Sequence, residues 1–226
     1  MSASPAAPRL LHDLPAVTVR TCVVSEMQNN VFLLTSKTTG AQILIDAADE
    51  PESIEALLAA AADDTPCEPH LDLLITTHRH WDHIRATAAV VERHSPRSAA
   101  GAADAEEIEK ETGTEVTERL EHGDTVGVDG IDLDVIGLRG HTPGSVALVL
   151  QPCPDEPPVV FSGDSQFPGG VGKTWSDEDF RSLLADVTER LFGVYEDDTV
   201  VHPGHGNSTT LGAERPHLDE WAERGW

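Results

Sequence analysis

The stretch THRHWDH, at positions 77–83, concentrates side chains that bind metal ions. Its three imidazoles and one carboxylate lie within six residues and directly follow an apolar stretch. Imidazole nitrogen and carboxylate oxygen are ligands of Zn²⁺ and similar divalent ions. In extended or loop backbone, His78, His80 and Asp82 can project toward one side, and His83 begins the next helix. An accidental surface cluster is the alternative. The spacing favours a metal site, and four crowded groups on one loop can serve two ions.

Three further positions share one local pattern, in which an apolar strand ends, a turn containing glycine follows, and one ligand-type side chain is presented. They are His141 in RGHTPGS, Asp164 in FSGDS and His205 in HPGHG. Strand ends hold such ligands on rigid elements, and the glycines allow close backbone approach. We therefore expect these three side chains to join the first cluster.

The elements that must position these residues follow from hydrophobic periodicity. Apolar or β-branched runs predict strands at 17–24, 31–35, 41–45, 71–76, 125–128, 131–138, 145–150, 159–161 and 199–201. Helical spacing predicts helices at 49–64, 84–94, 102–111, from Ser176 to about Leu191, and 216–224. The strands cluster and do not alternate strictly with helices, which favours two packed sheets with helices outside. We expect residues 1–8 to be a flexible tail and 9–226 to be one domain, with QPCPDEPP at 151–158 as a hairpin loop.

Composition narrows the class of protein further. The 226 residues are 39% hydrophobic, which supports a real core and excludes collagen-like, coiled-coil and wholly disordered chains. Fifteen basic against 40 acidic residues give a net charge of −25, which argues against a nucleic-acid partner. The three cysteines are widely spaced, so no disulfide framework is expected. Neither a signal peptide nor a membrane-length apolar run is recognised, and the sequence predicts a cytoplasmic protein without membrane contact.

The motifs together resemble those of the metallo-β-lactamase-fold hydrolases, and within them the glyoxalase II (hydroxyacylglutathione hydrolase) branch. The resemblance is carried by THRHWDH, GHTPGS, SGDS, FPGGVGKT, and HPGHG followed by TTLGAERPH, in that order from about Val17 onward. It implies an α/β fold, a four-layer αββα sandwich with a two-metal site at one edge of the sheets. Full-length members of that branch carry a C-terminal helical domain that helps to hold glutathione. Only residues 207–226 follow the HPGHG motif here, so that part of the resemblance is missing.

The resemblance also implies roles for individual residues. The first metal ion would be bound by His78, His80 and His141, the second by Asp82, His83 and His205, and Asp164 would bridge both. Zn²⁺ is the expected ion, with iron or manganese as alternatives. Asp82 is also the expected catalytic residue, and Lys173 in GGVGKT the expected contact for a substrate carboxylate.

The expected reaction is hydrolysis of a thioester, the S-acyl conjugate of a low-molecular-weight thiol, by a hydroxide that bridges two dications. A persulfide dioxygenase-like enzyme with one iron held by residues matching His78, His141 and Asp164 is an alternative, although its closing motif differs from HPGHG. A lactonase or β-lactamase activity is another, and a metal-stabilised scaffold without turnover is the non-catalytic one. The expected partner is a small-molecule substrate, and the chain is expected to be a monomer or a homodimer.

Overall fold

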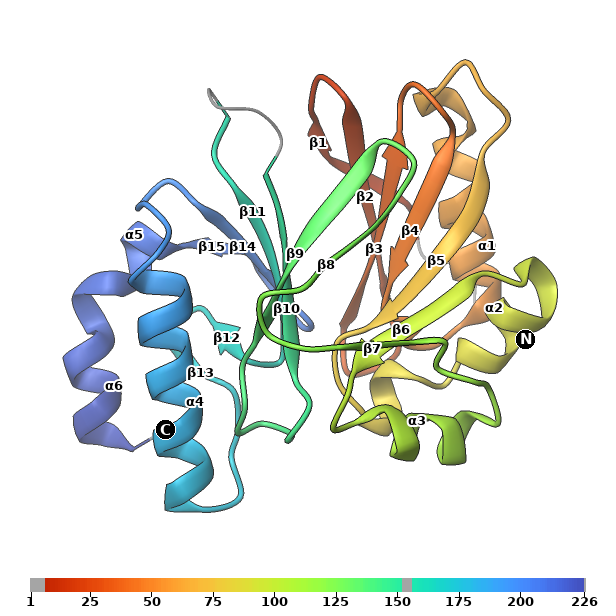
Figure 1. Cartoon of the computed structure of the whole chain (residues 1–226). Coiled ribbons are helices and arrows are strands. Elements are labelled where there is room, and N and C mark those ends of the chain that lie inside the picture. Colours follow the sequence, from red (N-terminus) through yellow and green to blue (C-terminus); the bar gives the residue numbers. More distant parts are fainter. Residues whose placement is uncertain (1–6, 152–155, 226) are drawn as a thin grey trace.

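Two β-sheets face each other and helices cover their outer sides (Figure 1). The structure is a computed structural model that describes residues 7–151 and 156–225. The predicted αββα sandwich is confirmed. Residues 1–6 of the expected tail and 152–155 of the expected hairpin loop lie outside the described residues, and the first strand begins at Arg9.

The first sheet has seven strands in sequence order. They are β1 (Arg9–Asp13), β2 (Val17–Val24), β3 (Asn29–Ser36), β4 (Ala41–Ile45), β5 (His70–Thr76), β6 (Arg97–Gly101) and β7 (Glu118–Leu120). Strands β1 to β4 pair antiparallel, whereas β4 to β7 pair parallel. The parallel strands therefore end at one edge of the sheet, where the loop after β5 begins.

The second sheet has six strands in the order β15-β14-β11-β10-β9-β8. Their bounds are β8 (Thr125–Val128), β9 (Ile131–Gly137), β10 (Val146–Leu150), β11 (Val159–Gly163), β14 (Val200–Pro203) and β15 (Thr209–Thr210). Only β11 and β14 pair in parallel, so their carboxyl ends are neighbours although about forty residues separate them. A small hairpin, β12 (Gln166–Phe167) and β13 (Gly170–Val171), follows β11.

The helices divide between the outer faces of the two sheets (Figure 1). On the side of the first sheet lie α1 (Pro51–Ala60), α2 (Thr87–His94) and α3 (Ala105–Thr112), and on the side of the second α4 (Asp177–Val187), α5 (Leu211–Glu214) and α6 (Leu218–Arg224). Separate apolar clusters join each group to its sheet. The predicted start of α4 is confirmed, because the Ser176 hydroxyl accepts a hydrogen bond from the Asp179 amide at 3.1 Å. No helix in the described ranges is long and apolar enough to cross a membrane.

The core between the sheets is built from the inward-facing residues of both. Phe161 of β11 is fully buried, and its ring centroid lies 5.0 Å from that of Phe32 in β3. Leu148 in β10 belongs to the same cluster and is also fully buried. This apolar layer fixes the two sheets against each other, so loops that leave their common edge start from rigid positions.

Several elements differ from the sequence expectation. Strands β1, β6, β7, β12, β13 and β15 were not predicted. His83 does not begin the next helix. It closes the short 3₁₀ turn Trp81–His83, and α2 begins only at Thr87. The helix expected at 102–111 begins at Ala105, and its Ala105 and Ile108 are buried and not turned to solvent.

A pair of leucine variants tests the inter-sheet core. We predict that Leu148→Ala lowers the free energy of unfolding by about 2–5 kcal/mol, because it opens a cavity in a close-packed layer. Leu10→Ala in β1 is the matched control, since 47% of that side chain is exposed, and should change stability by less than about 1 kcal/mol. Urea denaturation of both variants measures the difference, and equal effects would contradict the proposed core.

Candidate metal centre

The loop after β5 carries four of the predicted ligand residues. Thr76 ends the strand, and a hydrogen bond from the His83 amide to the His80 carbonyl at 3.0 Å closes the turn. This turn brings Asp82 and His83 inward, and both are buried, as is His78. His80 is half-buried. The local sequence therefore presents these side chains from one tight loop.

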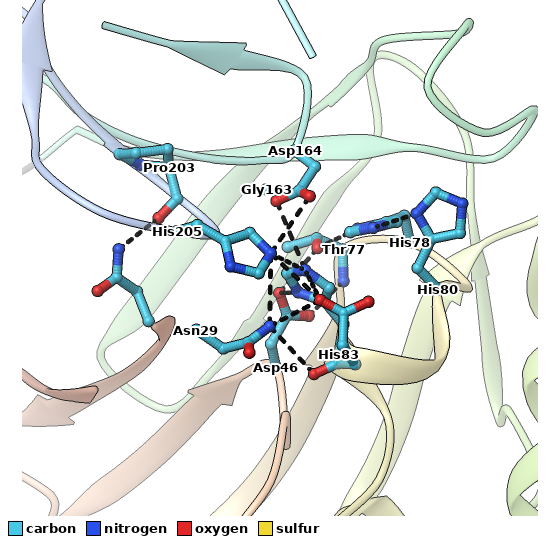
Figure 2. Close-up of polar contacts among 12 residues, drawn as sticks. Asn29, Asp46, Thr77, His78, His80, His83, Gly163, Asp164, Pro203 and His205 are labelled. Carbon is cyan, nitrogen blue, oxygen red and sulfur yellow. Dashed lines mark hydrogen bonds and ion pairs between the residues drawn. The ribbon is translucent and has the colours of Figure 1, made fainter. Parts of the chain in front are cut away.

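The other three predicted residues come from loops that leave the second sheet at the same edge. His141 follows β9, Asp164 follows β11, and His205 follows β14. The Gly204 amide donates to the Gly163 carbonyl at 2.9 Å, which joins the ends of the parallel strands. Figure 2 shows the ring of His205 directed toward Asp164 and His83. The structure thus brings all seven predicted residues together.

Two glycines make this convergence possible. Gly163 has a φ of +49°, and a Cβ there would lie 2.7 Å from the Thr77 hydroxyl. A Cβ on Gly204 would lie 2.3 Å from an oxygen of Asp164 and 2.7 Å from the ring of His83. Such contacts are too short for any side chain, so the glycines of SGDS and HPGHG are required by close approach.

The ligand atoms form overlapping groups of three within which they lie no more than 4.8 Å apart. These groups are His78, His80 and His141; Asp82, His83 and His205; and His78, His83 and Asp164. His78 Nε2 lies 3.1 Å from His80 Nδ1, and His83 Nε2 lies 3.1 Å from His205 Nε2. Two nitrogens on a tetrahedral Zn²⁺ ion are about 3.3 Å apart. We call the first group the three-histidine set and the second the mixed set.

Asp164 lies between these two sets. Its Oδ2 atom is 3.6 Å from Nε2 of His141 and 3.4 Å from Nε2 of His205. Its Oδ1 atom is 3.5 Å from Nε2 of His83. At these distances, Asp164 Oδ1 and His141 Nε2 are buried and have no hydrogen-bond partner among the described residues. Buried polar atoms without partners carry a free-energy cost that metal ions would remove, so the donor set fits divalent cations.

The histidines of the two sets differ in their electrostatics. Burial lowers the pKa of His78, His80 and His141, so the three-histidine set is neutral at pH 7. Burial also opposes charge on His83, but the carboxylates of Asp46 and Asp164 outweigh it and raise its pKa to about 10.

The mixed set is accordingly a cluster of opposite charges. At His205 the carboxylates of Asp164 and Asp82 overcome the effect of burial in the same way and raise the pKa to about 10. Burial likewise opposes ionisation of Asp82 and Asp164, yet the hydrogen bonds with His205 and the charge of His83 keep the pKa of both carboxyls below its ordinary value.

A buried carboxylate that the sequence analysis missed orients His83. Asp46, directly after β4, accepts hydrogen bonds from the Thr77 amide and hydroxyl, both at 2.8 Å. Its Oδ2 lies 2.9 Å from His83 Nδ1, which leaves Nε2 facing the centre. Asp46 has a φ of +58°, an unusual conformation for a residue other than glycine. It follows a strand end as Asp164 does, but no turn containing glycine accompanies it, so only part of that signal marks Asp46.

Two asparagines at the start of β3 also support the site, and no sequence signal marked them. Asn29 donates to the carbonyl and to Oδ2 of Asp82, at 3.1 and 2.9 Å. Asn30 donates from its side-chain nitrogen to the Pro203 carbonyl at 2.9 Å and from its main-chain N–H to the Gly204 carbonyl at 2.8 Å. Strand β3 therefore joins the loop after β5 to the loop after β14.

Lys173 lies beside the three-histidine set through its main chain. Its carbonyl oxygen is 2.7 Å from Nδ1 of His141, an arrangement that directs Nε2 of that ring to the centre. Its ammonium group stacks on the ring of Trp175, 4.4 Å from the centroid. Trp175 and Trp81 are 67% and 52% exposed, so both rings lie at the surface of the protein. The guanidinium of Arg85 covers Trp81 at 3.7 Å.

Comparison with known proteins identifies the family. The family model of the metallo-beta-lactamase superfamily matches residues 24–211, which include all seven converging side chains. The chain belongs to the metallo-beta-lactamase superfamily. This family binds divalent metal ions, and the histidine and aspartate clusters of the chain agree with that membership.

Among curated relatives, an uncharacterized protein of Mycobacterium tuberculosis is 42% identical over 103 residues, 45% of this chain and 46% of that protein. The match therefore spans less than half of this relative's length. The hydroxyacylglutathione hydrolase GloC of Haemophilus influenzae is 28% identical over 162 residues, 65% of this chain and 74% of GloC.

Two solved structures superpose well on this chain. ETHE1 from Myxococcus xanthus has a TM-score of 0.72 at 27% identity and covers 91% of this chain and 84% of its own. TTHA1623, solved in a di-iron-bound form, has a TM-score of 0.66 at 30% identity, with 86% and 96% covered. The similar proteins carry different names, so the comparisons alone do not assign an activity to this chain.

The charge pattern predicts proton release when the metal-free protein is loaded with Zn²⁺. His83 and His205, with pKa values of about 10, are protonated at pH 7 and must lose their protons to ligate. The neutral three-histidine set and the ionised carboxylates release none, so about two protons should leave per chain. Metal affinity should rise between pH 6 and pH 9 for the same reason.

Calorimetric titration at pH 7 in two buffers of different ionisation enthalpy measures this release. His205→Ala serves as the control and should release about one proton fewer than the wild-type chain. Zinc binding without proton release would contradict the charge assignment.

Proposed function

We propose that this chain is a two-metal thioester hydrolase of the glyoxalase II type, which cleaves the S-acyl conjugate of a low-molecular-weight thiol. The observation that carries the proposal is the position of Asp164, whose oxygens lie within 3.6 Å of nitrogens from both ligand sets. The relative named hydroxyacylglutathione hydrolase supports the choice of substrate class.

The residues present would hold two divalent ions, Zn²⁺ in the first instance. The three-histidine set would bind one ion, the mixed set the other, and Asp164 would contact both. A pair of such ions supplies a Lewis acid for the acyl carbonyl and lowers the pKa of water enough to provide a nucleophile near pH 7.

The protein's own contribution is orientation. Asp46 holds His83 through Nδ1, and the carbonyl of Lys173 holds His141 through Nδ1, so both rings present Nε2 to the centre. Asn29 fixes the carboxylate of Asp82, and we propose Asp82 as the residue on which turnover depends most directly. The ammonium group of Lys173, a residue whose carbonyl oxygen contacts His141, would bind an anionic group of the substrate.

An oxygenase with a single iron is the second candidate, because ETHE1 is similar over most of both chains. That reading would use His78, His141 and Asp164 and would leave the mixed set without a role. The completeness of the mixed set, with its support from Asp46 and Asn29, favours two ions. A lactonase or β-lactamase activity shares the proposed centre and differs only in substrate.

A substrate panel on metal-analysed protein tests the proposal. Thioesters of glutathione, of other cellular thiols and of coenzyme A, together with a lactone and a β-lactam, are assayed on one preparation whose metal content is measured. We expect two ions per chain and turnover of a thioester that a chelator abolishes and Zn²⁺ restores. One iron per chain with oxygen uptake would instead establish the oxygenase.

Substitution of Asp82 separates an enzyme from a metal-stabilised scaffold. Asp82→Ala should lower kcat/KM by more than about 100-fold, because even outer partners of metal ligands contribute about 10- to 100-fold. Asp63→Ala, at an exposed position, is the control and should leave turnover unchanged. The fold of both variants is checked by circular dichroism. Full activity of folded Asp82→Ala would overturn the assignment.

A further inference from the structure

Asp104 is a buried carboxylate that belongs to neither ligand set. It lies in the turn between β6 and α3, and its side chain is completely buried. The nearest cation is Arg79, whose Nε atom is 3.7 Å from Oδ1. A buried carboxylate needs hydrogen-bond donors around it, so the groups that donate to Asp104 indicate which parts of the structure it holds together.

Those donors come from two loops that belong to different sheets. Oδ2 accepts hydrogen bonds from the Arg79 amide at 3.1 Å and from the Thr142 hydroxyl at 2.5 Å. Oδ1 accepts from the Gly144 amide at 3.0 Å. Arg79 lies between His78 and His80, and Thr142 follows His141 in the chain. One carboxylate thus ties together the backbones that supply all three histidines of the three-histidine set.

Close backbone packing accompanies these bonds. A Cβ on Gly144 would lie 2.5 Å from the Asp104 amide nitrogen and 2.8 Å from its Cβ. A Cβ on Gly101, at the end of β6, would lie 1.9 Å from the Gly144 carbonyl oxygen. The glycine in HTPGS is therefore needed for Asp104 to reach the loop that carries His141.

The mixed set has its own, separate supports. Asp46 holds His83, and Asn29 holds Asp82. The hydrogen bonds of Asp104 reach neither of these residues. Loss of Asp104 should consequently affect one set of ligands and spare the other.

We propose that Asp104 is a positioning residue that fixes His78 and His80 relative to His141 and thereby sets the affinity of the three-histidine set for its ion. This inference rests on the proposed function, in which that set binds one of two divalent ions. Asp104 belongs to neither ligand set and acts through the main-chain amides of Arg79 and Gly144 and the side-chain hydroxyl of Thr142.

Asp104→Asn is the most direct test, because it keeps the shape and removes one acceptor. The side-chain NH2 group of asparagine is a donor, so it cannot accept the hydrogen bond that the carboxylate oxygen at that position accepted. The loop whose N–H or O–H group made that bond is then no longer held. We expect the affinity for one Zn²⁺ or Co²⁺ ion to fall by about 10- to 100-fold while the other ion stays bound as in the wild-type chain.

The measurement is a titration of metal-free protein with Co²⁺ followed by visible absorption, and with Zn²⁺ in competition with a chelator. Asp64→Asn is the matched control. That carboxylate is also largely buried and accepts from Thr18 and Arg20, and it lies outside the centre. It should lower stability without changing either metal affinity.

Background variants assign the weakened site. The loss caused by Asp104→Asn should persist in His205→Ala, where the three-histidine set is intact, and vanish in His80→Ala, where that set is already broken. If Asp104→Asn does not fold, Thr142→Val removes a single donor at nearly constant shape and should produce a smaller loss at the same site.

Two results would overturn the inference while leaving the proposed function in place. One is a wild-type chain with two ions and variants Asp104→Asn and Thr142→Val that bind both as tightly. The other is an equal loss of affinity at both sites in parallel with lower thermal stability, as a purely structural role predicts. A wild-type chain that never binds two ions would overturn the proposed two-metal function itself.

Discussion

The carboxylate of Asp164 has to lie within about 3.5 Å of imidazoles that originate from both sheets, and this requirement organises the rest of the structure. His83 comes from the loop after β5, whereas His141 and His205 leave the second sheet. The sheets can meet this requirement only if their separation is fixed. The apolar layer around Phe32 and Phe161 provides that constraint, because close-packed side chains resist displacement.

The two ligand sets are held together by different means. The mixed set places carboxylates beside protonated histidines, so in the metal-free protein its members attract one another. The three-histidine set has neutral imidazoles and lacks that attraction within itself. Its alignment has to come from outside, from the main chain of Lys173 and the carboxylate of Asp104. Of the two buried carboxylates outside the ligand sets, Asp104 supplies alignment that the three-histidine set lacks, whereas Asp46 orients His83 within the mixed set.

Sequence patterns predicted the parts of this arrangement that are local. The spacing in THRHWDH and the strand-turn-ligand pattern at His141, Asp164 and His205 located the side chains, and strands such as 17–24 and 41–45 were placed correctly. Asp46 shares only the strand-end part of this pattern, because it follows Ile45 directly with no turn containing glycine. Asn29 and Asp104 could not be predicted, because their partners lie about 25 to 175 residues away and depend on the pairing of elements. Strand β6, with the sequence RSAAG, escaped prediction because small residues carry little β-propensity.

The rim of the centre is built differently from its interior. The interior side chains are buried or half-buried and lie in loops that leave strand ends. The rim carries two exposed tryptophans, each covered by a cation, Arg85 on Trp81 and Lys173 on Trp175. In a chain with a net charge of −25, the ammonium group of Lys173 adds local positive charge, whereas the guanidinium of Arg85 also pairs with the carboxylate of Asp49 at 2.5 Å. An anionic substrate would be attracted there even though the protein as a whole repels it. Under the proposed function, selectivity among thioesters would depend on these rim residues, whereas the hydrolytic chemistry would depend on the ligand residues.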